Sequence, residues 1–384
     1  MRLFFRTAAV LLLAAAPAFG AQSPAHIVVD LDAGTVIAHK DAAKLWHPAS
    51  VTKLMTAYVT FRAMKAGAIT SETRVVVSQH ALNEPPSKMG YKVGTDMTLD
   101  NALKMMIVRS ANDIAMAIAE TVGGSESGFV AKMNAEAGRL GMASTVFRNP
   151  NGLPNDAQVT TARDLAVLTR AIWVEFPEYR EFFKIPAIKA GKKVLRSHNT
   201  LLERFRGANG MKTGFICASG FNMVATATRS GHTLAVVVLG SDSSKDRAEL
   251  AAKLLQDGFK RRVFGGNRPA LAGFRSTRSP GPAVNLKEQI CGKRKKQEGE
   301  SEPQLAGAFN RSALEPRFVL MDPVPVTTGI AAKKDGAKKP SGGIPIPRPR
   351  PPMPGDSAGL EPFVDEVARA LKQPDATPAA KSLQ

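Results

Sequence analysis

Two stretches of alternating apolar and polar residues lie far apart in the chain. The first covers residues 25–39 and is interrupted at 32–34, and the second pairs residues 221–228 with 233–240 around a polar turn. Alternation on both sides of a short glycine-containing turn is typical of a β-hairpin. The pattern therefore predicts two hairpins that are separated by almost two hundred residues.

Apolar residues recur every three or four positions in most of the remaining sequence up to residue 260, which is the spacing of amphipathic helices. The predicted helices cover residues 50–64, 99–108, 113–121, 126–140, 161–173 and 246–259. Residues 84–94 form a Pro/Gly-rich loop, and residues 184–194 show no clear period. The simplest packing places both hairpins in one antiparallel sheet, with helices covering it and a helical insert beside it. The expected fold class is α/β, of the α+β kind.

Composition changes sharply near Gly265. Nine of the 26 prolines precede this residue and seventeen follow it, together with several basic runs. Such sequence buries too little apolar surface to offset the entropy of ordering, so residues 265–384 are predicted to be a largely disordered basic tail. Residues 359–372 are the exception, because their apolar positions predict a short helix that could meet a partner or a membrane surface. The globular domain is expected over residues 22–264.

The first 21 residues have the features of a secretory signal peptide. Arg2 and Arg6 make a basic start, residues 8–16 are apolar, and small residues occupy the cleavage region at 18–20. The apolar run is too short to span a membrane. The sequence therefore predicts export to the periplasm, with the mature protein at most peripheral on the inner membrane.

The formal net charge is +19. In an exported protein, such an excess of positive charge favours contact with anionic membrane or cell-wall surfaces, and the basic tail is the expected source. No zinc-ligand spacing and no RNA-binding signature accompanies the charge, which argues against a nucleic-acid partner.

Two cysteines are present, Cys217 and Cys291. They could pair in an oxidising compartment, but they lie in segments of very different character, and two thiols are no disulfide framework. We interpret Cys217 as a small buried apolar residue and Cys291 as a residue of the tail.

Ser50 and Lys53 form a Ser-x-x-Lys motif at the start of the first predicted helix. A spacing of three places both side chains on one helix face, about one turn apart. A serine hydroxyl needs a base within hydrogen-bond reach to act as a nucleophile. A lysine that burial and cationic neighbours keep neutral can be that base. The motif alone is common, and the alternative is a helix-capping serine followed by a solvated lysine.

Two further motifs follow in the same region. Ser110-x-Asn112 falls at a tight junction between two predicted helices. Lys212-Thr213-Gly214 precedes the second hairpin, where the edge of a strand could present backbone groups to a substrate. Alone, the first could be a helix cap and the second a turn that contains a lysine. Three such motifs in one exported globular region are hard to attribute to coincidence.

The motif order Ser-x-x-Lys, Ser-x-Asn, Lys-Thr-Gly resembles the serine-type D-alanyl-D-alanine carboxypeptidases, which are low-molecular-weight penicillin-binding proteins of the penicillin-recognising peptidase family. The resemblance covers roughly residues 25–264 and extends to the stretches at 106–113, 149–153, 160–165 and 210–215. It implies a β-lactamase/transpeptidase-like fold and an acyl-enzyme mechanism without cofactor or metal. The implied ligands are peptidoglycan stem peptides and β-lactam antibiotics.

The resemblance implies a catalytic role for five residues. Ser50 would attack the carbonyl between two terminal D-alanines, and Lys53 would take the proton of its hydroxyl. Ser110 would relay a proton to the leaving amine, while Asn112 would orient Lys53 and hold the substrate amide. Lys212 would add positive charge that helps to keep Lys53 neutral.

Substrate binding is implied for the Lys212-Thr213-Gly214 motif and two further residues. Lys212 would attract the terminal carboxylate of the substrate, and Thr213 would donate a hydrogen bond to it. The backbone N–H of Phe215, which follows Gly214, would form the oxyanion hole together with that of the nucleophile. Arg247, in the last helix, resembles a family position that helps to bind the carboxylate. Its alternative is a surface arginine.

The sequence departs from the family pattern in three places. Residues 215–217 are apolar where many relatives carry polar residues, and residues 198–200 replace a more basic stretch. Both departures could alter substrate preference or turnover. The β-rich second domain that is common in the family is not evident in residues 265–384, although the helix predicted at 359–372 could mimic the family's C-terminal membrane anchor.

Three alternative functions stay open. A β-lactamase of similar fold would deacylate with a glutamate-positioned water, and no Glu-x-x-Leu-Asn motif occurs between Asn112 and Lys212. A D,D-endopeptidase would use the same site on cross-links. A non-catalytic peptidoglycan-associated scaffold would act through the basic tail, although all the motif residues of an enzyme are present.

Overall fold

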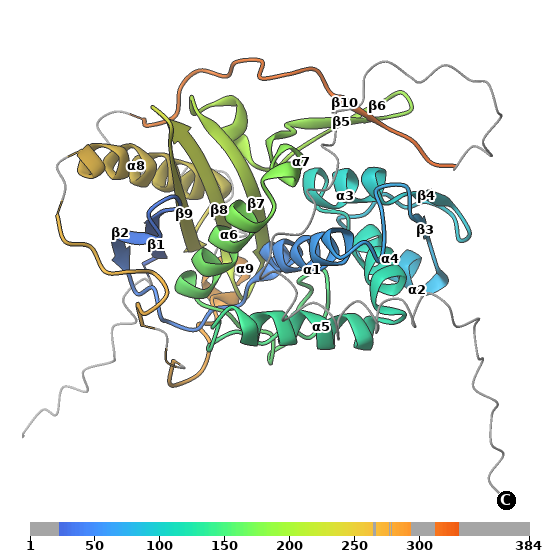
Figure 1. Ribbon diagram of the computed structural model, residues 1–384, viewed down its shortest axis with the longest axis horizontal. Helices are drawn as coiled ribbons and strands as arrows, with labels where there is room; N and C mark the ends of the chain where they lie inside the picture. Colours follow the sequence, from blue (N-terminus) through green and yellow to red (C-terminus); the bar gives the residue numbers. More distant parts are fainter. Residues whose placement is uncertain (1–22, 264–265, 276, 278, 293–311, 330–384) are drawn as a thin grey trace, which may run out of the picture.

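A five-stranded antiparallel sheet forms the centre of the protein (Figure 1). The computed structural model describes residues 23–263, 266–275, 277, 279–292 and 312–329. The strands are β1 (Ala25–Asp30), β2 (Thr35–Lys40), β7 (Ala208–Ile216), β8 (Gly220–Arg229) and β9 (His232–Ser241). Their order is β2-β1-β9-β8-β7. The predicted joining of the two hairpins in one sheet is therefore confirmed, and β7, which carries the Lys-Thr-Gly motif, is an edge strand.

Helices bury both faces of this sheet. α8 (Ser244–Val263) covers one face, and α6 (Ala162–Glu175) packs on the other (Figure 1). Along β9, Val236 and Val238 belong to the core under α8, whereas Val237 belongs to the core on the α6 side. Successive side chains of a strand point to opposite faces, and each fully buried valine contributes about 1.5–3 kcal/mol. β9 is thus stabilised from both sides.

The helices predicted between the hairpins are present. They are α1 (Lys53–Lys65), α3 (Leu99–Val108), α4 (Asn112–Gly123), α5 (Glu126–Arg139) and α6. The short elements β3 (Arg74–Val76), α2 (Gln79–Asn83) and β4 (Asp96–Thr98) lie among them in the chain. Residues 53–64 of α1 are all buried, because α3, α4, α5 and α6 surround this helix. The helix predicted from Ser50 begins at Lys53 instead, since the 3₁₀ turn η1 (Ala49–Thr52) precedes it.

The segment without a clear period contains short elements. After η2 (Pro177–Tyr179), α7 (Glu181–Lys184) leads into the hairpin of β5 (Ala187–Ala190) and β6 (Lys193–Arg196), and η3 (Thr200–Glu203) follows. β10 (Val324–Val326) extends this hairpin by pairing parallel to β5. These strands have only three or four residues and one partner is distant in sequence, so no local pattern predicts them.

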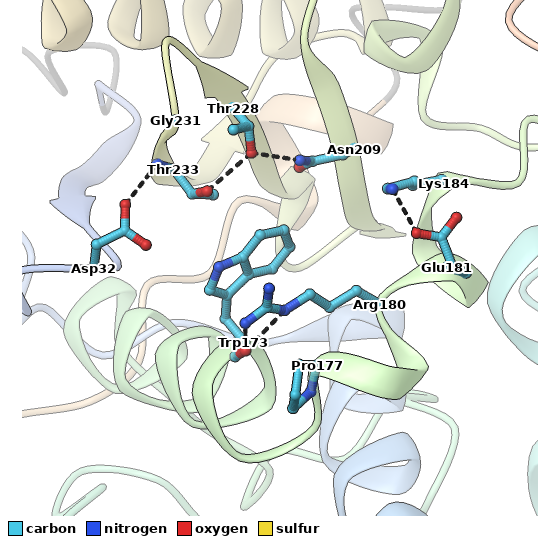
Figure 2. A pocket seen from close by; sticks show the side chains of 10 residues that line it. All are labelled: Asp32, Trp173, Pro177, Arg180, Glu181, Lys184, Asn209, Thr228, Gly231 and Thr233. Carbon is cyan, nitrogen blue, oxygen red and sulfur yellow. Dashed lines mark hydrogen bonds and ion pairs between the residues drawn. The ribbon is translucent and has the colours of Figure 1, made fainter. Parts of the chain in front are cut away.

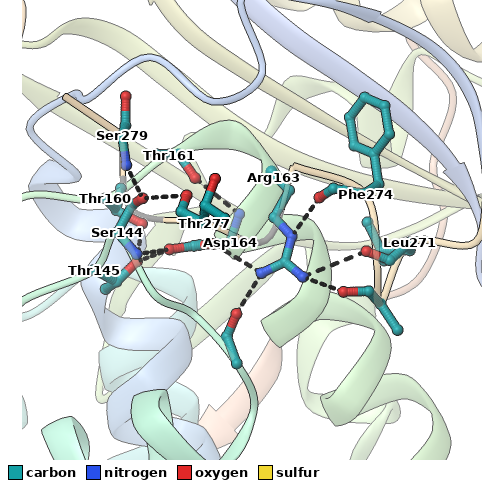
Figure 3. Close-up of polar contacts among 12 residues, drawn as sticks. Ser144, Thr145, Thr160, Thr161, Arg163, Asp164, Leu271, Phe274, Thr277 and Ser279 are labelled. Carbon is teal, nitrogen blue, oxygen red and sulfur yellow. Dashed lines mark hydrogen bonds and ion pairs between the residues drawn. The ribbon is translucent and has the colours of Figure 1, made fainter.

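Arg163 holds the segment that follows α8 on the domain (Figure 3). Its side chain is 2% exposed and donates to the carbonyl oxygens of Phe274 at 3.0 Å and Ala272 at 2.7 Å. Asp164 accepts from Arg163 at 3.0 Å and from the backbone N–H of Ser144 at 3.0 Å. A buried ion pair is stable only when its remaining donors and acceptors are satisfied, as they are here. The start of the predicted tail is therefore part of the packed structure.

A second stretch of the predicted tail, residues 312–329, runs from α8 to β5 (Figure 1). Ser312 donates to Glu249 of α8 at 2.6 Å, and the backbone N–H of Glu315 donates to the carbonyl of Arg204 at 2.8 Å. The stretch ends beside α3 after β10. The domain boundary at residue 264 stays a prediction, but two stretches beyond it pack on the domain.

The sequence left open whether the two cysteines pair, and the favoured interpretation, which gave them separate roles, is wrong. Cys217 and Cys291 form a disulfide, with a Cα–Cα distance of 5.7 Å. Cys217 lies in the turn between β7 and β8, and Cys291 ends α9 (Lys287–Cys291). Leu286, just before α9, is buried, and its N–H donates to the carbonyl of Ala218 at 2.9 Å. The packing of Leu286 brings the two cysteines together. The sequence does not predict this contact, because the segment around Leu286 contains few apolar residues.

Loss of this disulfide is expected to lower the stability of the fold. The bond joins residues 74 positions apart, and a loop of that length corresponds to about 4 kcal/mol in the entropy of the unfolded chain. Reductant should lower the Tm by roughly 10 °C in thermal unfolding followed by circular dichroism. The double variant Cys217→Ser/Cys291→Ser should unfold at the lower temperature with or without reductant. An unchanged Tm in both experiments would contradict this contribution.

Two predicted segments, the signal peptide at 1–21 and the helix at 359–372, lie outside the described residues. Within the part of the chain that the structure describes, no helix combines the length and apolar character needed to cross a membrane.

Candidate active site

Ser50 lies in η1, immediately before the central helix α1. Ala49, the residue before it, has φ +50°, in the left-handed region that residues other than glycine rarely adopt. The side-chain amide of Asn222 on β8 donates to the carbonyl oxygens of His47 at 2.9 Å and Pro48 at 3.1 Å. Strained backbone persists where its neighbours over-determine it. The sheet therefore fixes the backbone that leads into Ser50.

Two glycines allow other segments to touch the backbone around Ser50. A Cβ on Gly214 would lie 2.9 Å from the backbone nitrogen of Ser50. A Cβ on Gly152, whose φ is +86°, would lie 1.9 Å from the carbonyl oxygen of Ala49. Only glycine permits such close approach. Edge strand β7 therefore lies directly against the backbone of Ser50, and Phe215 is the next residue in that strand.

Lys53 is 1% exposed and has three close partners. Its Nζ donates to Asn112 Oδ1 at 2.7 Å and to the carbonyl oxygen of Asn151 at 2.6 Å, and it lies 3.0 Å from Ser50 Oγ. The first two partners can only accept hydrogen bonds. In a neutral amine they take both N–H groups, which leaves the lone pair directed at the hydroxyl of Ser50.

Burial holds the pKa of Lys53 well below its ordinary value, because the ammonium form would lose its hydration there, and the positive charge of Lys212 lowers the pKa further. The negative charges of Glu84 and Asp113 act in the opposite direction. A neutral amine whose lone pair meets a hydroxyl is the arrangement that general-base activation of a nucleophile requires.

Ser110 and Lys212 form a second bonded pair. Ser110 lies at the junction of α3 and α4 with φ +62°, and Lys212 on β7 is 3% exposed and donates from Nζ to Ser110 Oγ at 2.9 Å. Asn112 opens α4 two residues after Ser110 and contacts Lys53. The three motifs therefore converge around Ser50, as the sequence led us to expect.

Burial and the nearby charge of Arg247 lower the pKa of Lys212 to about 7. Arg247 lies on α8 but is only 3% exposed, and it donates to the carbonyl oxygens of Asn222 and His198, both at 3.3 Å. Its guanidinium carbon lies 5.8 Å from the ring centre of Phe221. The alternative interpretation of Arg247 as a surface arginine is therefore wrong.

Thr213 and Phe215 lie on β7 with Lys212. Thr213 is 6% exposed, whereas Phe215 is 43% exposed and packs on Phe221 with ring centres 4.3 Å apart. The apolar departure from the family pattern thus includes an exposed aromatic ring, Phe215, which packs on the half-buried Phe221 near the end of the strand that touches Ser50.

Two residues of this site have no counterpart in the prediction, Asn151 and Glu84. Asn151 offers its backbone carbonyl to Lys53, and its side-chain amide donates to Glu84 Oε2 at 3.0 Å. The family-like stretch at 149–153 is a signal that this loop matters. It does not reveal the role, because any residue type can supply a carbonyl oxygen.

A separate hollow of about 460 Å³ lies beside the start of β7 (Figure 2). Arg180 covers the ring of Trp173 there at 4.2 Å, and Asp32 accepts from the backbone N–H of Thr233 at 2.9 Å. None of the predicted site residues line this hollow, and its charged side chains Arg180 and Asp32 contact other residues of the lining. The candidate active site is therefore the cluster around Ser50.

Residues 13–243 match the family model described as D-alanyl-D-alanine carboxypeptidase. D-alanyl-D-alanine carboxypeptidase DacC of Escherichia coli is 35% identical to this chain over 243 residues, which cover 62% of this chain and 61% of that relative. The chain thus matches about three fifths of the length of this curated relative.

Two solved structures have a similar fold. The D-alanyl-D-alanine carboxypeptidase DacD from Francisella tularensis has a TM-score of 0.59 and 30% identity, over 66% of this chain and 75% of that one. A penicillin-binding protein from Listeria monocytogenes in its cefotaxime-bound form has a TM-score of 0.56 and 29% identity, over 61% of this chain and 96% of that one.

Proposed function

Because the chain belongs to the D-alanyl-D-alanine carboxypeptidase family, we propose that it removes the terminal D-alanine from peptidoglycan stem pentapeptides through an acyl-enzyme on Ser50. The observation that carries this proposal is the position of Lys53. Its Nζ lies 3.0 Å from Ser50 Oγ, while its contacts with two obligatory acceptors leave the lone pair of the neutral amine for the serine hydroxyl.

Acylation begins when Lys53 takes the proton of Ser50 as Oγ attacks the carbonyl carbon between the terminal D-alanines. A C–O bond to Ser50 forms, the C–N bond to the last D-alanine breaks, and the leaving amine receives a proton relayed from Lys53 through Ser110. The backbone N–H groups of Ser50 and Phe215, which the absence of a side chain on Gly214 allows to approach, are proposed to hold the oxyanion. Loss of one such donor typically costs about 10²–10³ in rate.

The terminal carboxylate of the substrate is proposed to bind at Thr213 and Lys212, with Arg247 as an additional cation. In support, Nε of Arg247 is buried and has no hydrogen-bond partner among the described residues. Asn112 is proposed to orient Lys53 through Oδ1 and to meet the substrate amide with one N–H. Its Nδ2 donates to the carbonyl of Pro85 at 2.8 Å and carries a second hydrogen.

Deacylation uses Lys53 as the base again, with water in place of the Ser50 hydroxyl. Water adds to the acyl carbon as Lys53 takes one of its protons, and the ester oxygen of Ser50 leaves with that proton, which gives a tetrapeptide and free enzyme. A β-lactam amide offers Ser50 a similar carbonyl. The proposal therefore includes covalent binding of penicillin.

A β-lactamase is less favoured, because the family match describes a carboxypeptidase. A D,D-endopeptidase would use the same chemistry on cross-linked peptides and would differ only in substrate. A scaffold that acts through its tail would have no need of a neutral buried lysine beside a serine.

Incubation of the purified full chain with a pentapeptide that ends in D-Ala-D-Ala, with measurement of free D-alanine, tests the proposal. Release of one D-alanine per peptide is expected. Rapid penicillin hydrolysis without this release would favour a β-lactamase, cleavage confined to cross-linked dimers would favour an endopeptidase, and no reaction in any assay would favour the scaffold.

Export and a peripheral position on the envelope are proposed from the sequence. The first 21 residues resemble a signal peptide, which would place the protein in the periplasm. Residues 330–384, the segment after β10, contain nine basic and six acidic residues. This segment is proposed to contact anionic membrane or cell-wall surfaces, as are the other basic parts of the tail.

Deletion of residues 330–384 is expected to leave hydrolysis of a soluble pentapeptide unchanged and to reduce the fraction of protein that sediments with membranes or cell-wall sacculi. The deletion spares every described residue. Because salt screens attraction between exposed charges, added salt should release the full chain in the same sedimentation assay. Equal sedimentation of both chains would count against a role for this segment.

A further inference from the structure

The two acceptors that hold Lys53 are themselves held by two consecutive residues, Glu84 and Pro85. The side chain of Asn151, whose carbonyl accepts from Lys53 at 2.6 Å, donates to Glu84 Oε2 at 3.0 Å. The side chain of Asn112, whose Oδ1 accepts from Lys53 at 2.7 Å, donates to the carbonyl of Pro85 at 2.8 Å. One dipeptide therefore sets the position of both acceptors.

The loop that contains this dipeptide is attached to the start of α4. The N–H of Asn112 donates to the carbonyl of Ser87 at 2.7 Å. The carboxylate of Asp113 accepts from the N–H groups of Met89 at 3.0 Å and Gly90 at 2.8 Å. Proline at positions 85 and 86 restricts the backbone further. The carboxylate of Glu84 is thus presented to Asn151 by a segment with little freedom to move.

Glu84 also acts on Lys53 through its charge. Its side chain is 11% exposed, and burial raises the pKa of its carboxyl group above the ordinary value, although its contact with Asn151 and the charges of His80 and Lys53 act in the opposite direction. In the ionised form, Glu84 favours the charged form of Lys53 and so opposes Lys212.

Other titratable groups surround Glu84. His80 lies 4.0 Å from its carboxylate and also contacts Glu120 at 3.1 Å and Glu126 at 3.6 Å. Glu126 raises the pKa of Glu84, and Asp113 acts on Lys53 in the same direction as Glu84 does. Among these acidic groups, Glu84 is the one whose carboxylate bonds to Asn151.

We propose that Glu84 is a positioning residue for the general base, because it fixes the Asn151 carbonyl that orients Lys53 and places a negative charge near that amine. The inference rests on the proposed function for the identity of Lys53 as the base. It assigns to Glu84 no contact with the substrate.

The test is the pH dependence of Ser50 acylation by benzylpenicillin in wild type, Glu84→Gln and Glu84→Ala, measured as a second-order rate constant on the full chain. Glu84→Gln keeps an acceptor for Asn151 and removes the charge. Loss of the charge lowers the pKa of Lys53, so the neutral base persists to lower pH. The acid limb of the profile should therefore move to lower pH with the maximal rate largely kept.

Glu84→Ala should show the same displacement and, because the Asn151 amide loses its acceptor and Lys53 is less precisely placed, a maximal rate lower by about tenfold or more. Glu120→Gln is the matched control, since it removes a carboxylate that contacts His80 but has no bond to Asn151. Its profile should coincide with that of the wild type. Thermal unfolding of each variant separates misfolding from altered chemistry, and the isosteric Glu84→Gln carries the test if the alanine variant fails to fold.

An acid limb of Glu84→Gln that coincides with the wild type would overturn the inference. Normal acylation of Glu84→Gln together with a selective block of its deacylation would also overturn the inference, because Glu84 would then act on the hydrolytic water. If penicillin acylates the wild type but the pentapeptide yields no D-alanine, the proposed substrate is wrong. The inference about Glu84 is still tested in that case, because the acylation profiles do not depend on the peptide.

Discussion

Replacement of Ser50 by alanine is expected to abolish covalent acylation by penicillin and to lower D-alanine release by at least about 10⁴-fold. The alanine lacks the oxygen that forms the acyl-enzyme, and no other hydroxyl is bonded to Lys53 among the described contacts. The measurements are the intact mass of the protein after exposure to penicillin and free D-alanine from a pentapeptide. The fold should persist, because Ser50 Oγ makes only a long contact of 3.5 Å to the carbonyl of Asn151 besides its contact with Lys53.

Ser71→Ala, in the turn before β3, is the control and should react as the wild type does. Persistent acylation of Ser50→Ala would mean that another residue is the nucleophile. Ser110 would then be the first to examine, since its hydroxyl is bonded to the other buried lysine, Lys212.

Lys53→Ala is expected to lower the rate of acylation by about 10²–10⁴-fold, the usual contribution of a positioned general base. The loss should appear in both acylation by penicillin and release of D-alanine, because the same proton is transferred in each. Lys65→Ala, an exposed lysine at the other end of α1, is the matched control and should keep the wild-type rates. Equal rates in Lys53→Ala and the wild type would show that Ser50 is activated in another way.

The pH profile of the wild type tests the same assignment without a substitution. In the proposed mechanism Lys53 acts as the neutral amine, so kcat/KM should rise with pH as Lys53 loses its proton, and the depressed pKa places this rise well below the usual range of a lysine. Lys212 is proposed to act as the cation, and its pKa of about 7 predicts a fall in kcat/KM at higher pH. A rate that still rises steadily up to pH 10 would contradict both roles.

The regular elements could be predicted because their patterns are local. The alternation around residues 30 and 230 predicts four of the five strands of the central sheet but not β7, and α3 has the predicted bounds, Leu99–Val108. Helices with one apolar face and strands with alternating faces are readable from a short window of sequence. The three sequence motifs are local as well, although Ser50 lies in the 3₁₀ turn before α1 and not in the predicted helix itself.

The remaining features depend on contacts between distant segments. β10 pairs with β5 across more than one hundred residues, and the disulfide of Cys217 depends on the packing of Leu286. Neither contact has a signature in the surrounding composition, which is rich in proline and charge after residue 265. Pairing at a distance is decided by tertiary packing, which local propensity does not encode.

The support of Lys53 shows the same limit at the active site. The carbonyl of Asn151 and the carboxylate of Glu84 come from loops separated by 67 residues, and Asn151 accepts from the Lys53 side chain through its backbone oxygen. A motif search finds residue types, so it identified Lys53 and Asn112 but not the second acceptor. The structure also shows that Arg247 belongs to the buried site, a choice that helical periodicity left open.

Identification of the acylated residue during turnover tests the account most directly. The full chain is mixed with a D-Ala-D-Ala pentapeptide, quenched within milliseconds to seconds, and digested for peptide mass mapping, with free D-alanine measured in the same samples. The account predicts a tetrapeptidyl ester on Ser50 that forms as D-alanine is released and then decays. D-alanine release with no adduct, or with an adduct on another residue, would contradict it.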